Sequence, residues 1–423
     1  MRFEKPCSLA RVVLAIFLIL LALTIATRPS HAQTFKVLHT FHGKDGNGPA
    51  GVLVRDKAGN LYGTTEAGGT GKCGDYGCGT AFELDKHGKK VWVHSFDVAD
   101  GESPSAGLLR DEAGNLYGTT DNGGMTKCTF GCGTVFELDS MGNETVFYKF
   151  KQPPDGNTPQ SLLARDGRGN LYGVTQEGGK YSNGTIFKVN GKGKETVLHN
   201  FTGGSDGCLP VAGLISDASG NLYGATAQGG VGLCDQGYGV VFELDTTGTL
   251  TVLYSFGFGD GAYPGSVLLL DGAGNLYGTT EGGGNGTCGP DGCGVAFELS
   301  PHPDGTWSEA VLYYFCSLSG CTDGEEPLSG PLVRDSAGNL YGTTIFGGAN
   351  RNCNGDACGV VFKLAPGGNE TILYNFTGEA DGAFPYAGLA IDGDGNLYGT
   401  ANYGGDSNCD SPYGCGTVFK ITP

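Results

Sequence analysis

The fold of this 423-residue chain is decided by the stretch Asp56-Lys57-Ala58-Gly59-Asn60-Leu61-Tyr62-Gly63, versions of which return seven times. The core of the stretch, Gly-Asn-Leu-Tyr-Gly, always begins three residues after an aspartate. Its seven copies start at Gly59, Gly114, Gly169, Gly220, Gly274, Gly338 and Gly395. A self-similar period of about 55 residues lies in the range typical of propeller blades.

Each copy reads as a tight hairpin between two short strands. Gly-Asn supplies the positive-φ residues that a strand reversal requires, and the aspartate side chain can cap free backbone N–H groups of the turn. Four strands, A to D, are expected in each repeat. In the first repeat they are Val52–Arg55, Leu61–Thr65, Thr80–Leu84 and Val91–Phe96. Four antiparallel strands form one blade, and neighbouring blades cover one another's apolar faces.

The two ends of the repeat array complement each other. Phe35–Phe41 matches strand D of the other repeats, whereas the chain stops after Gly416–Ile421, which matches strand C. We therefore expect residues 33–423 to form a single domain, an all-β, seven-bladed β-propeller with four antiparallel strands per blade. The N-terminal strand would close the last blade and protect its edge. An open array or β-helix is the alternative, and it would need capping repeats that the sequence does not show.

Residues 1–32 are expected to be a signal peptide. Basic residues precede an apolar run from Val12 to Ala26, and Ser30-His31-Ala32 offers small residues at the two positions that a signal peptidase reads. We expect cleavage near Ala32, a secreted or periplasmic protein, and no stable membrane anchor. An uncleaved anchor is the alternative, although the run is shorter than the ~20 residues that a span needs.

The composition excludes some partners. Asp and Glu number 44 against 26 Lys and Arg, which gives a net charge of −18 at pH 7. Such a surface repels nucleic acid and anionic lipid, so neither is expected as a partner, and we expect a monomer. The 79 glycines show no three-residue period. They are repeated because the turns are repeated.

The cysteine spacing predicts seven disulfides. Fourteen of the 15 cysteines follow the expected signal peptide, and short spacings in an exported chain indicate disulfides. The close pairs are Cys73/Cys78, Cys128/Cys132, Cys288/Cys293, Cys316/Cys321, Cys353/Cys358 and Cys409/Cys415. The two remaining residues, Cys208 and Cys234, lie in loops that emerge on the same face of a propeller, so we expect a bridge between them. Zinc is the alternative, but two loops would have to converge and the usual two-residue knuckle spacing is absent.

A second aspartate motif, Asp-Gly-x-x-Pro, connects each repeat to the next. It begins at Asp45, Asp100, Asp155, Asp206, Asp260, Asp323 and Asp381. Seven carboxylates on one face could form a calcium-binding ring. Ordinary turn chemistry explains the same pattern, because aspartate followed by glycine, with proline at a fixed offset, favours a turn. We therefore expect no metal and no cofactor, with calcium kept as the alternative.

No catalytic motif stands out. His39, His94 and His199 occupy one position in strand D that is tyrosine in the other repeats, which indicates a need for an amphipathic ring and not for a base. A reaction centre needs unlike residues in unlike roles, so on a repetitive scaffold it should appear as a departure from the repeat. The departures are the B–C and D–A loops.

These loops are the candidate ligand-binding face, since loops on a rigid scaffold commonly carry binding. Their irregular acidic and aromatic residues are Asp75, Tyr76, Asp235, Tyr238, Asp291, Glu325, Glu326, Asp356, Asp410 and Tyr413. We expect an extracellular binding module for a glycan or a protein. The alternative is an extracellular polysaccharide hydrolase or lyase, although no spacing identifies a pair of catalytic carboxylates. Acidic and aromatic side chains lining a deep central pocket would favour the enzyme.

The combined motif resembles a known family. Asp-x-x-Gly-Asn-Leu-Tyr-Gly-Thr-Thr, then Gly-Gly, then Gly-Thr-Val-Phe-Glu-Leu is similar to the repeats of the bacterial secreted proteins called GloVer, or choice-of-anchor, proteins. The resemblance covers essentially all of the chain after the expected signal peptide. It implies an extracellular or cell-surface role with differing C-terminal anchors, and no established activity or catalytic residue. Pro423 follows the last strand within two residues, so we expect no sorting tail here.

Overall fold

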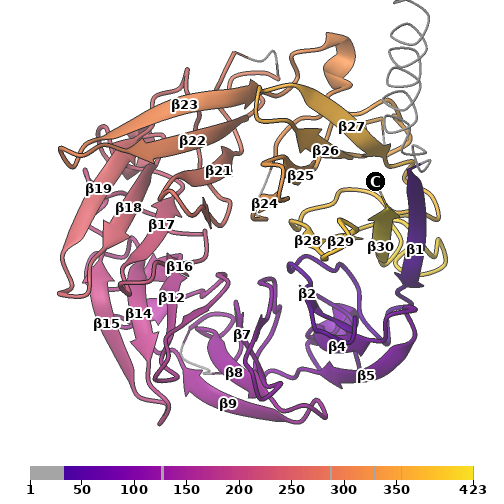
Figure 1. Ribbon diagram of the computed structural model, residues 1–423. Helices are drawn as coiled ribbons and strands as arrows, with labels where there is room; N and C mark the ends of the chain where they lie inside the picture. Colours follow the sequence, from indigo (N-terminus) through magenta and orange to yellow (C-terminus); the bar gives the residue numbers. More distant parts are fainter. Residues whose placement is uncertain (1–32, 125–127, 286–287, 328–329, 354, 423) are drawn as a thin grey trace, which may run out of the picture.

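The computed structural model describes residues 33–422, apart from 125–127, 286–287, 328–329 and 354. Seven four-stranded antiparallel sheets stand in a ring, and the chain is the predicted seven-bladed β-propeller (Figure 1). The expected signal peptide lies outside the described residues. None of the helices in the described part of the chain is long and apolar enough to span a membrane.

In blades 1 to 6 the strands follow in sequence order from the axis outward (Figure 1). Blades 1 to 3 are β2 (Val54–Arg55), β3 (Leu61–Thr65), β4 (Thr80–Leu84), β5 (Lys90–Ser95); β6 (Leu109–Arg110), β7 (Leu116–Thr120), β8 (Thr134–Leu138), β9 (Glu144–Lys149); β11 (Ala164–Arg165), β12 (Leu171–Thr175), β14 (Thr185–Val189), β15 (Glu195–Asn200). Blades 4 to 6 are β16 (Ile215–Ser216), β17 (Leu222–Thr226), β18 (Val240–Leu244), β19 (Leu250–Ser255); β20 (Leu269–Leu270), β21 (Leu276–Thr280), β22 (Val295–Pro301), β23 (Trp307–Tyr314); β24 (Val333–Arg334), β25 (Leu340–Thr344), β26 (Val360–Leu364), β27 (Glu370–Asn375). A small extra sheet joins β10 (Gly156–Asn157) to β13 (Glu177–Gly178).

Blade 7 is closed by the N-terminal strand, as expected. It consists of β28 (Ala390–Ile391), β29 (Leu397–Ala401), β30 (Thr417–Thr422) and β1 (Thr34–Thr40). The register of β1 on β30 runs from Thr34 opposite Thr422 to Thr40 opposite Thr417. The first and last strands therefore lie side by side in one sheet, where Figure 1 shows indigo beside yellow.

The repeated aspartate organises the hairpin between strands A and B. In blade 1, Asp56 Oδ1 accepts hydrogen bonds from the backbone N–H groups of Ala58 and Asn60, both at 2.9 Å, and Oδ2 accepts one from the Tyr62 hydroxyl at 3.2 Å. One detail of the sequence interpretation was wrong: only Gly59 takes a positive φ, of 94°, whereas Asn60 does not. Asn60 instead donates its side-chain amide to Asp56 Oδ2 at 3.2 Å.

Strand A is shorter than expected. In blade 1 it covers Val54–Arg55, not Val52–Arg55. The reason is crowding near the axis, where a Cβ atom on Gly51 would lie only 2.7 Å from the carbonyl oxygen of Ala106 in the next blade. That oxygen accepts a hydrogen bond from Thr64 Oγ1 at 2.8 Å. The start of strand A therefore contacts the neighbouring blade instead of pairing within its own.

The hydrophobic core lies between adjacent blades. Each interface buries a phenylalanine from strand C against the phenylalanine that follows strand D of the preceding blade. Phe136 and Phe96, for example, are both fully buried with ring centroids 4.9 Å apart. The repeated glycine of strand B makes room for the first ring, because a Cβ atom on Gly118 would lie 2.5 Å from Phe136.

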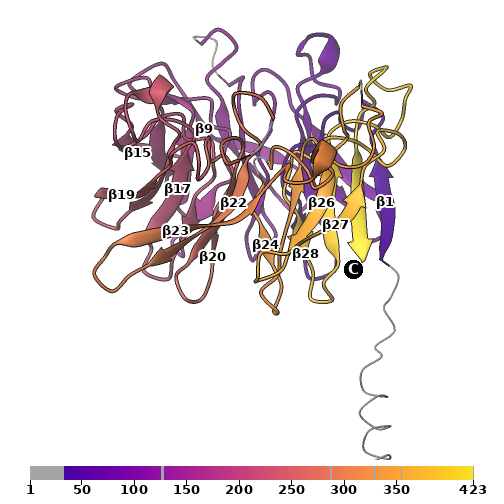
Figure 2. The ribbon, with the colours of Figure 1, turned by 90° about the horizontal axis from the view of Figure 1, so that it is seen from above.

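The two faces of the ring differ. We call the face formed by the B–C and D–A loops the loop face, and the face formed by the short A–B and C–D turns the turn face (Figure 2). The loop face contains three short 3₁₀ helices, η1 (Gly74–Tyr76), η2 (Cys234–Gln236) and η3 (Ser319–Cys321).

The structure forms the seven disulfides that the spacing predicted. They are Cys73–Cys78, Cys128–Cys132, Cys208–Cys234, Cys288–Cys293, Cys316–Cys321, Cys353–Cys358 and Cys409–Cys415. The three sulfurs of Cys288, Cys316 and Cys321 lie close together, but all are oxidised in disulfides and offer no thiolate for zinc.

Candidate binding site at the centre of the loop face

The D–A loops are held in one conformation at every blade junction. The residue before the loop proline has a positive φ in all seven loops, including 56° at Ser103 and 55° at Glu326. Its backbone joins two blades: Ser103 accepts a hydrogen bond from Asp121 N–H in blade 2 and donates one to the carbonyl of Cys78 in blade 1, at 3.1 and 2.9 Å. Positive φ is costly for residues other than glycine, so these contacts impose the loop shape.

The residue after strand B varies among the blades, with six residue types in seven positions, although the strand before it is nearly constant. In blade order it is Glu66, Asp121, Gln176, Ala227, Glu281, Ile345 and Asn402. This position is bonded to the D–A loop, and it is where the seven-fold repeat breaks into unlike side chains. Three of the seven are acidic.

The three acids and Glu326 form one acid cluster. Tyr386, which follows the loop proline of blade 7, has its pKa raised by burial, by Tyr403, and by the charges of Glu66, Glu326 and Glu281. These groups come from blades on different sides of the ring. A single phenol can respond to all of them only near the axis. We therefore place Glu66, Glu281 and Glu326 at the centre of the loop face. Asp121 joins them because the charge of Glu66 also helps to raise its pKa, and we call these four residues the acid cluster.

Asp121 is the most enclosed member of the acid cluster. Its side chain is only 8% exposed, with Oδ1 accepting a hydrogen bond from Ser105 Oγ at 2.7 Å and Oδ2 accepting one from Gln160 Nε2 at 3.0 Å. Burial raises the pKa of Asp121 to about 7, against the lowering effect of the two hydrogen bonds, and the charge of Glu66 adds to the rise. Asp121 therefore exchanges a proton near neutral pH.

The other acids are also perturbed. Burial, followed by the charges of Glu281, Glu325 and Asp291, raises the pKa of Glu326 to about 7. Burial raises the pKa of Glu66 as well. Glu66 is nevertheless exposed to solvent. A carboxylate at the central opening of the ring has both properties, because it faces water on one side and protein surrounds it on the others.

A row of aromatic side chains borders the acid cluster on blades 6 and 7. Phe346 packs against Phe384, Phe384 against Tyr403, and Tyr403 against Tyr413, with ring centroids 5.4, 5.7 and 5.6 Å apart. We call these four residues the aromatic row. Its contact with the acid cluster is electrostatic, since the charge of Glu66 helps to raise the pKa of Tyr403, after burial.

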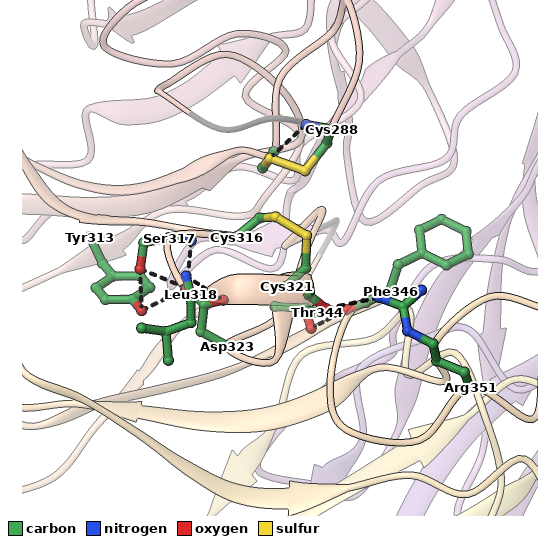
Figure 3. Close-up of a disulfide and its surroundings, with 12 residues drawn as sticks. Cys288, Tyr313, Cys316, Ser317, Leu318, Cys321, Asp323, Thr344, Phe346 and Arg351 are labelled. Carbon is green, nitrogen blue, oxygen red and sulfur yellow. Dashed lines mark hydrogen bonds between the residues drawn. A yellow bond between two sulfur atoms is a disulfide. The ribbon is translucent and has the colours of Figure 1, made fainter.

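The loop that carries Glu326 is fastened at several points. The Cys316–Cys321 disulfide closes its first half, and Asp323 Oδ2 accepts hydrogen bonds from Ser317 N–H at 2.7 Å and from the Tyr313 hydroxyl at 2.8 Å (Figure 3). The second half pairs with the post-strand-B segment of blade 6, where Glu325 and Phe346 exchange backbone hydrogen bonds. Glu326 is therefore presented by a braced loop.

The structure brings some of the predicted site residues together. Asp75, Tyr76 and Asp410 line one pocket of about 340 Å³ between blades 1 and 7, beside His42 and Asn47. In this pocket Asn47 Nδ2 donates to Asp410 at 3.1 Å. Tyr76 is 71% exposed there and is available to a ligand.

The remaining predicted residues are distributed over the loop face. The charge of Asp291 acts on Glu281 and Glu326, and that of Asp356 acts on Glu325. Tyr413 belongs to the aromatic row. Tyr238 is half-buried against Phe258 and Tyr263, and Asp235 is exposed on η2.

Sequence reasoning missed most of the acid cluster. Among its members only Glu326 was predicted, since it lies in a connection that is longer than its equivalents in the other repeats. Glu66, Asp121 and Glu281 stand at the first position of their B–C loops, directly after strand B and before the part of the loop that varies in length. Comparing the seven repeats position by position, and looking for the one place where Glu, Asp, Gln, Ala, Ile and Asn replace one another, would have found them.

The seven Asp-Gly-x-x-Pro aspartates do not pair with one another in the described structure. Six of them contact a ring of the preceding strand D, as when the Tyr374 hydroxyl donates to Asp381 at 2.9 Å, and several cap their own loop, as when Thr377 N–H donates to Asp381 at 2.9 Å. They therefore act mainly as turn and junction residues.

Comparison with protein families gives a match over nearly the whole chain. The Gloeobacter/Verrucomicrobia repeat matches residues 24–165, 70–290 and 287–423. The chain belongs to this family. A comparison with curated proteins gave no match. Membership of the Gloeobacter/Verrucomicrobia repeat family agrees with the resemblance that the motifs indicated, and the family description names a repeat without an activity.

Solved structures resemble this Gloeobacter/Verrucomicrobia repeat protein in fold alone. A fungal alcohol oxidase in complex with copper has a TM-score of 0.55 at 15% identity, over 92% of this chain and 76% of that one. The extracellular domain of a one-component system from B. thetaiotaomicron has a TM-score of 0.53 at 15% identity, over 92% of this chain and 42% of that one. A gluconolactonase from Xanthomonas campestris has a TM-score of 0.40 at 15% identity, over 68% and 78%.

Proposed function

We propose that this protein is exported and binds an extracellular carbohydrate at the centre of its loop face. The observation that carries the proposal is the acid cluster lying beside the aromatic row. Carboxyl groups exchange hydrogen bonds with sugar hydroxyls, and aromatic rings pack against the apolar faces of sugar rings. Pinned loops lose little entropy when a ligand docks. Seven disulfides support export, because disulfides persist in oxidising compartments.

The test is a glycan array probed with the chain from Gln33 onward, followed by calorimetry on the glycans that bind. We expect Glu326→Gln and Tyr403→Ala to weaken binding at least tenfold, since each removes a direct contact. Tyr76→Ala, Tyr238→Ala and Tyr413→Ala test the wider loop face.

The matched controls lie on the turn face. Lys86→Ala, Ser140→Ala and Thr247→Ala change exposed residues of C–D turns and should leave binding unchanged. Absence of any glycan ligand, or weakening by the turn-face variants alone, would contradict the proposal. Binding to a protein and to no glycan would mean that the ligand of this face is a protein and not a carbohydrate.

A second candidate function is cleavage of an extracellular polysaccharide by a hydrolase or a lyase reaction. Two carboxyl groups with pKa values near 7, Asp121 and Glu326, suit general acid and base roles at neutral pH. The test is release of reducing ends or unsaturated ends from polysaccharides between pH 5 and 8. Asp121→Asn should abolish that release but keep binding. Turnover that survives both Asp121→Asn and Glu326→Gln would exclude this site as the catalytic centre.

A further inference from the structure

Each blade junction builds the same three-residue contact at the rim of the ring, which we call the rim triad. It consists of a ring from strand D of one blade, the Asp-Gly-x-x-Pro aspartate of the loop that follows, and the residue near the start of strand D in the next blade. The seven triads are His39/Asp45/Lys90, His94/Asp100/Glu144, Tyr148/Asp155/Glu195, His199/Asp206/Leu250, Tyr254/Asp260/Glu309, Tyr313/Asp323/Glu370 and Tyr374/Asp381/Phe35.

In six rim triads the ring is close to its aspartate. The four tyrosine hydroxyls donate hydrogen bonds of 2.5 to 2.9 Å to the carboxylate. The Nε2 atoms of His199 and His39 lie 3.1 and 3.3 Å from theirs. In the triad His39/Asp45/Lys90 the third residue is itself a cation, and Lys90 Nζ donates a hydrogen bond to Asp45 at 3.3 Å.

The triad between blades 1 and 2 is different. His94 Nε2 and Glu144 Oε1 are both buried, and neither has a hydrogen-bond partner among the described residues. The equivalent Oε1 atoms of Glu195, Glu309 and Glu370 also lack a partner, but at those junctions the ring hydroxyl donates to its aspartate, whereas here the ring nitrogen lacks a partner as well. One potential ligand atom from each of His94, Asp100 and Glu144 lies within 4.8 Å of the other two. A buried nitrogen and a buried carboxylate oxygen without partners cost free energy unless another group satisfies them.

The surrounding charges favour a cation. Asp97 adds a third carboxylate near the triad, and its backbone N–H donates to Asp100 Oδ1 at 2.7 Å, which orients that carboxylate. Lys149 opposes a cation, but its ammonium group donates to the carbonyl of Ala99. The His94 ring offers an unpartnered nitrogen to this site, and imidazole nitrogen is a common metal ligand.

We propose that His94, Asp100 and Glu144 form a site for a divalent transition metal, with Zn²⁺ as the best fit. One imidazole nitrogen with two carboxylate oxygens is a zinc ligand set, whereas Ca²⁺ prefers oxygen alone. Among the seven rim triads, only this one combines a histidine with two acidic residues. The metal would fasten blade 1 to blade 2 from outside the core.

The experiment titrates the chelator-treated chain from Gln33 onward with Zn²⁺ by calorimetry, and with Co²⁺ by visible absorption. We expect one Zn²⁺ per chain and a Co²⁺ spectrum with a nitrogen ligand. His94→Tyr installs the ring that four other junctions use, so the fold should tolerate it. It should weaken Zn²⁺ binding at least tenfold and remove the Co²⁺ spectrum.

Two further variants keep the proposal testable. Glu144→Gln preserves shape and should also weaken binding at least tenfold, which covers the case in which His94→Tyr fails to fold. The control is His199→Tyr, the same ring exchange at a junction whose third residue is Leu250, and it should leave affinity unchanged. No Zn²⁺ binding by the unmodified chain, or equal binding by Glu144→Gln and the unmodified chain, would overturn the site.

Discussion

Phe35, near the start of the chain, stacks on Tyr374 of blade 6, with ring centroids 3.7 Å apart and ring planes 7° from parallel. The same ring lies 5.5 Å from Phe419 in β30. β1 is therefore held in two ways, by its ladder to β30 and by aromatic contacts with the neighbouring blade. Closure of the ring combines hydrogen bonding with apolar burial.

Deleting Thr34–Gly43 should destabilise the whole ring. The deletion removes the outer strand of blade 7, exposes the edge of β30 and uncovers Phe419 and Tyr374. We expect aggregation or a melting temperature lower by about 10 °C or more, measured by calorimetry and light scattering. Phe35→Ala should produce a smaller loss, because it keeps the ladder. A truncated chain that stayed monomeric with an unchanged melting temperature would contradict this account of closure.

The Cys208–Cys234 disulfide should stabilise the fold more than the short ones. It separates its cysteines by 26 residues, against 5 for Cys73–Cys78. In the chain-entropy account, replacing both cysteines by alanine costs about 3–4 kcal/mol for the long loop and about 2 kcal/mol for the short one. Chemical denaturation of the two double variants measures the difference. Equal losses would show that loop length does not govern the effect here.

Stability should depend on pH through the rim carboxyls. Burial and the charge of Asp323 raise the pKa of Glu370 from 4.5 to about 8. Because the folded state favours the protonated acid, its contribution is fully present below pH 4.5 and is lost as pH rises through about 8. Glu370→Leu, which copies Leu250 of blade 4, should therefore raise the melting temperature relative to the unmodified chain by about 1–3 °C more at pH 9 than at pH 5. Glu112→Leu, at an exposed turn, serves as the control and should show no such trend.

The hairpin aspartates should matter more than the aspartates of the C–D turns. Asp217 accepts hydrogen bonds from two backbone N–H groups, from the Asn221 amide and from the Tyr223 hydroxyl. We expect Asp217→Ala to lower the free energy of unfolding by about 1–3 kcal/mol, since it leaves half-buried donors unpaired. Asp245→Ala, in the exposed turn of the same blade, should cost less. Denaturant unfolding of both variants compares them directly, and a larger loss for Asp245→Ala would reject the ranking.

The fold was predictable because the repeat contains its own turn chemistry. Asp56, Gly59 and Tyr62 specify one hairpin, and seven copies of that hairpin specify a ring. The short strand A was not predictable, since the limit comes from another blade: Gly51 faces the backbone of Ala106. The residues of strand A itself do not indicate how close the backbone of the next blade lies.

The site was predictable only in part. Glu326 and Asp291 were found because their loops differ in length or composition from the repeat. Asp121 was not, because burial raises its pKa, and the residues that enclose it, including its partners Ser105 and Gln160, come from different loops and meet it only when the ring is closed. The metal ligands were hidden for the same reason, since His94 and Glu144 belong to different blades.

The pairing of Thr34 with Thr422 has a consequence for chain connectivity. The first and last described strands are neighbours in one sheet, and every other junction repeats the same D–A connection. A short linker between these two strands, with a new opening in any D–A loop, would give a circularly permuted chain whose seven blades keep all their contacts. The order in which blades are synthesised is therefore separable from the order in which they stand around the axis.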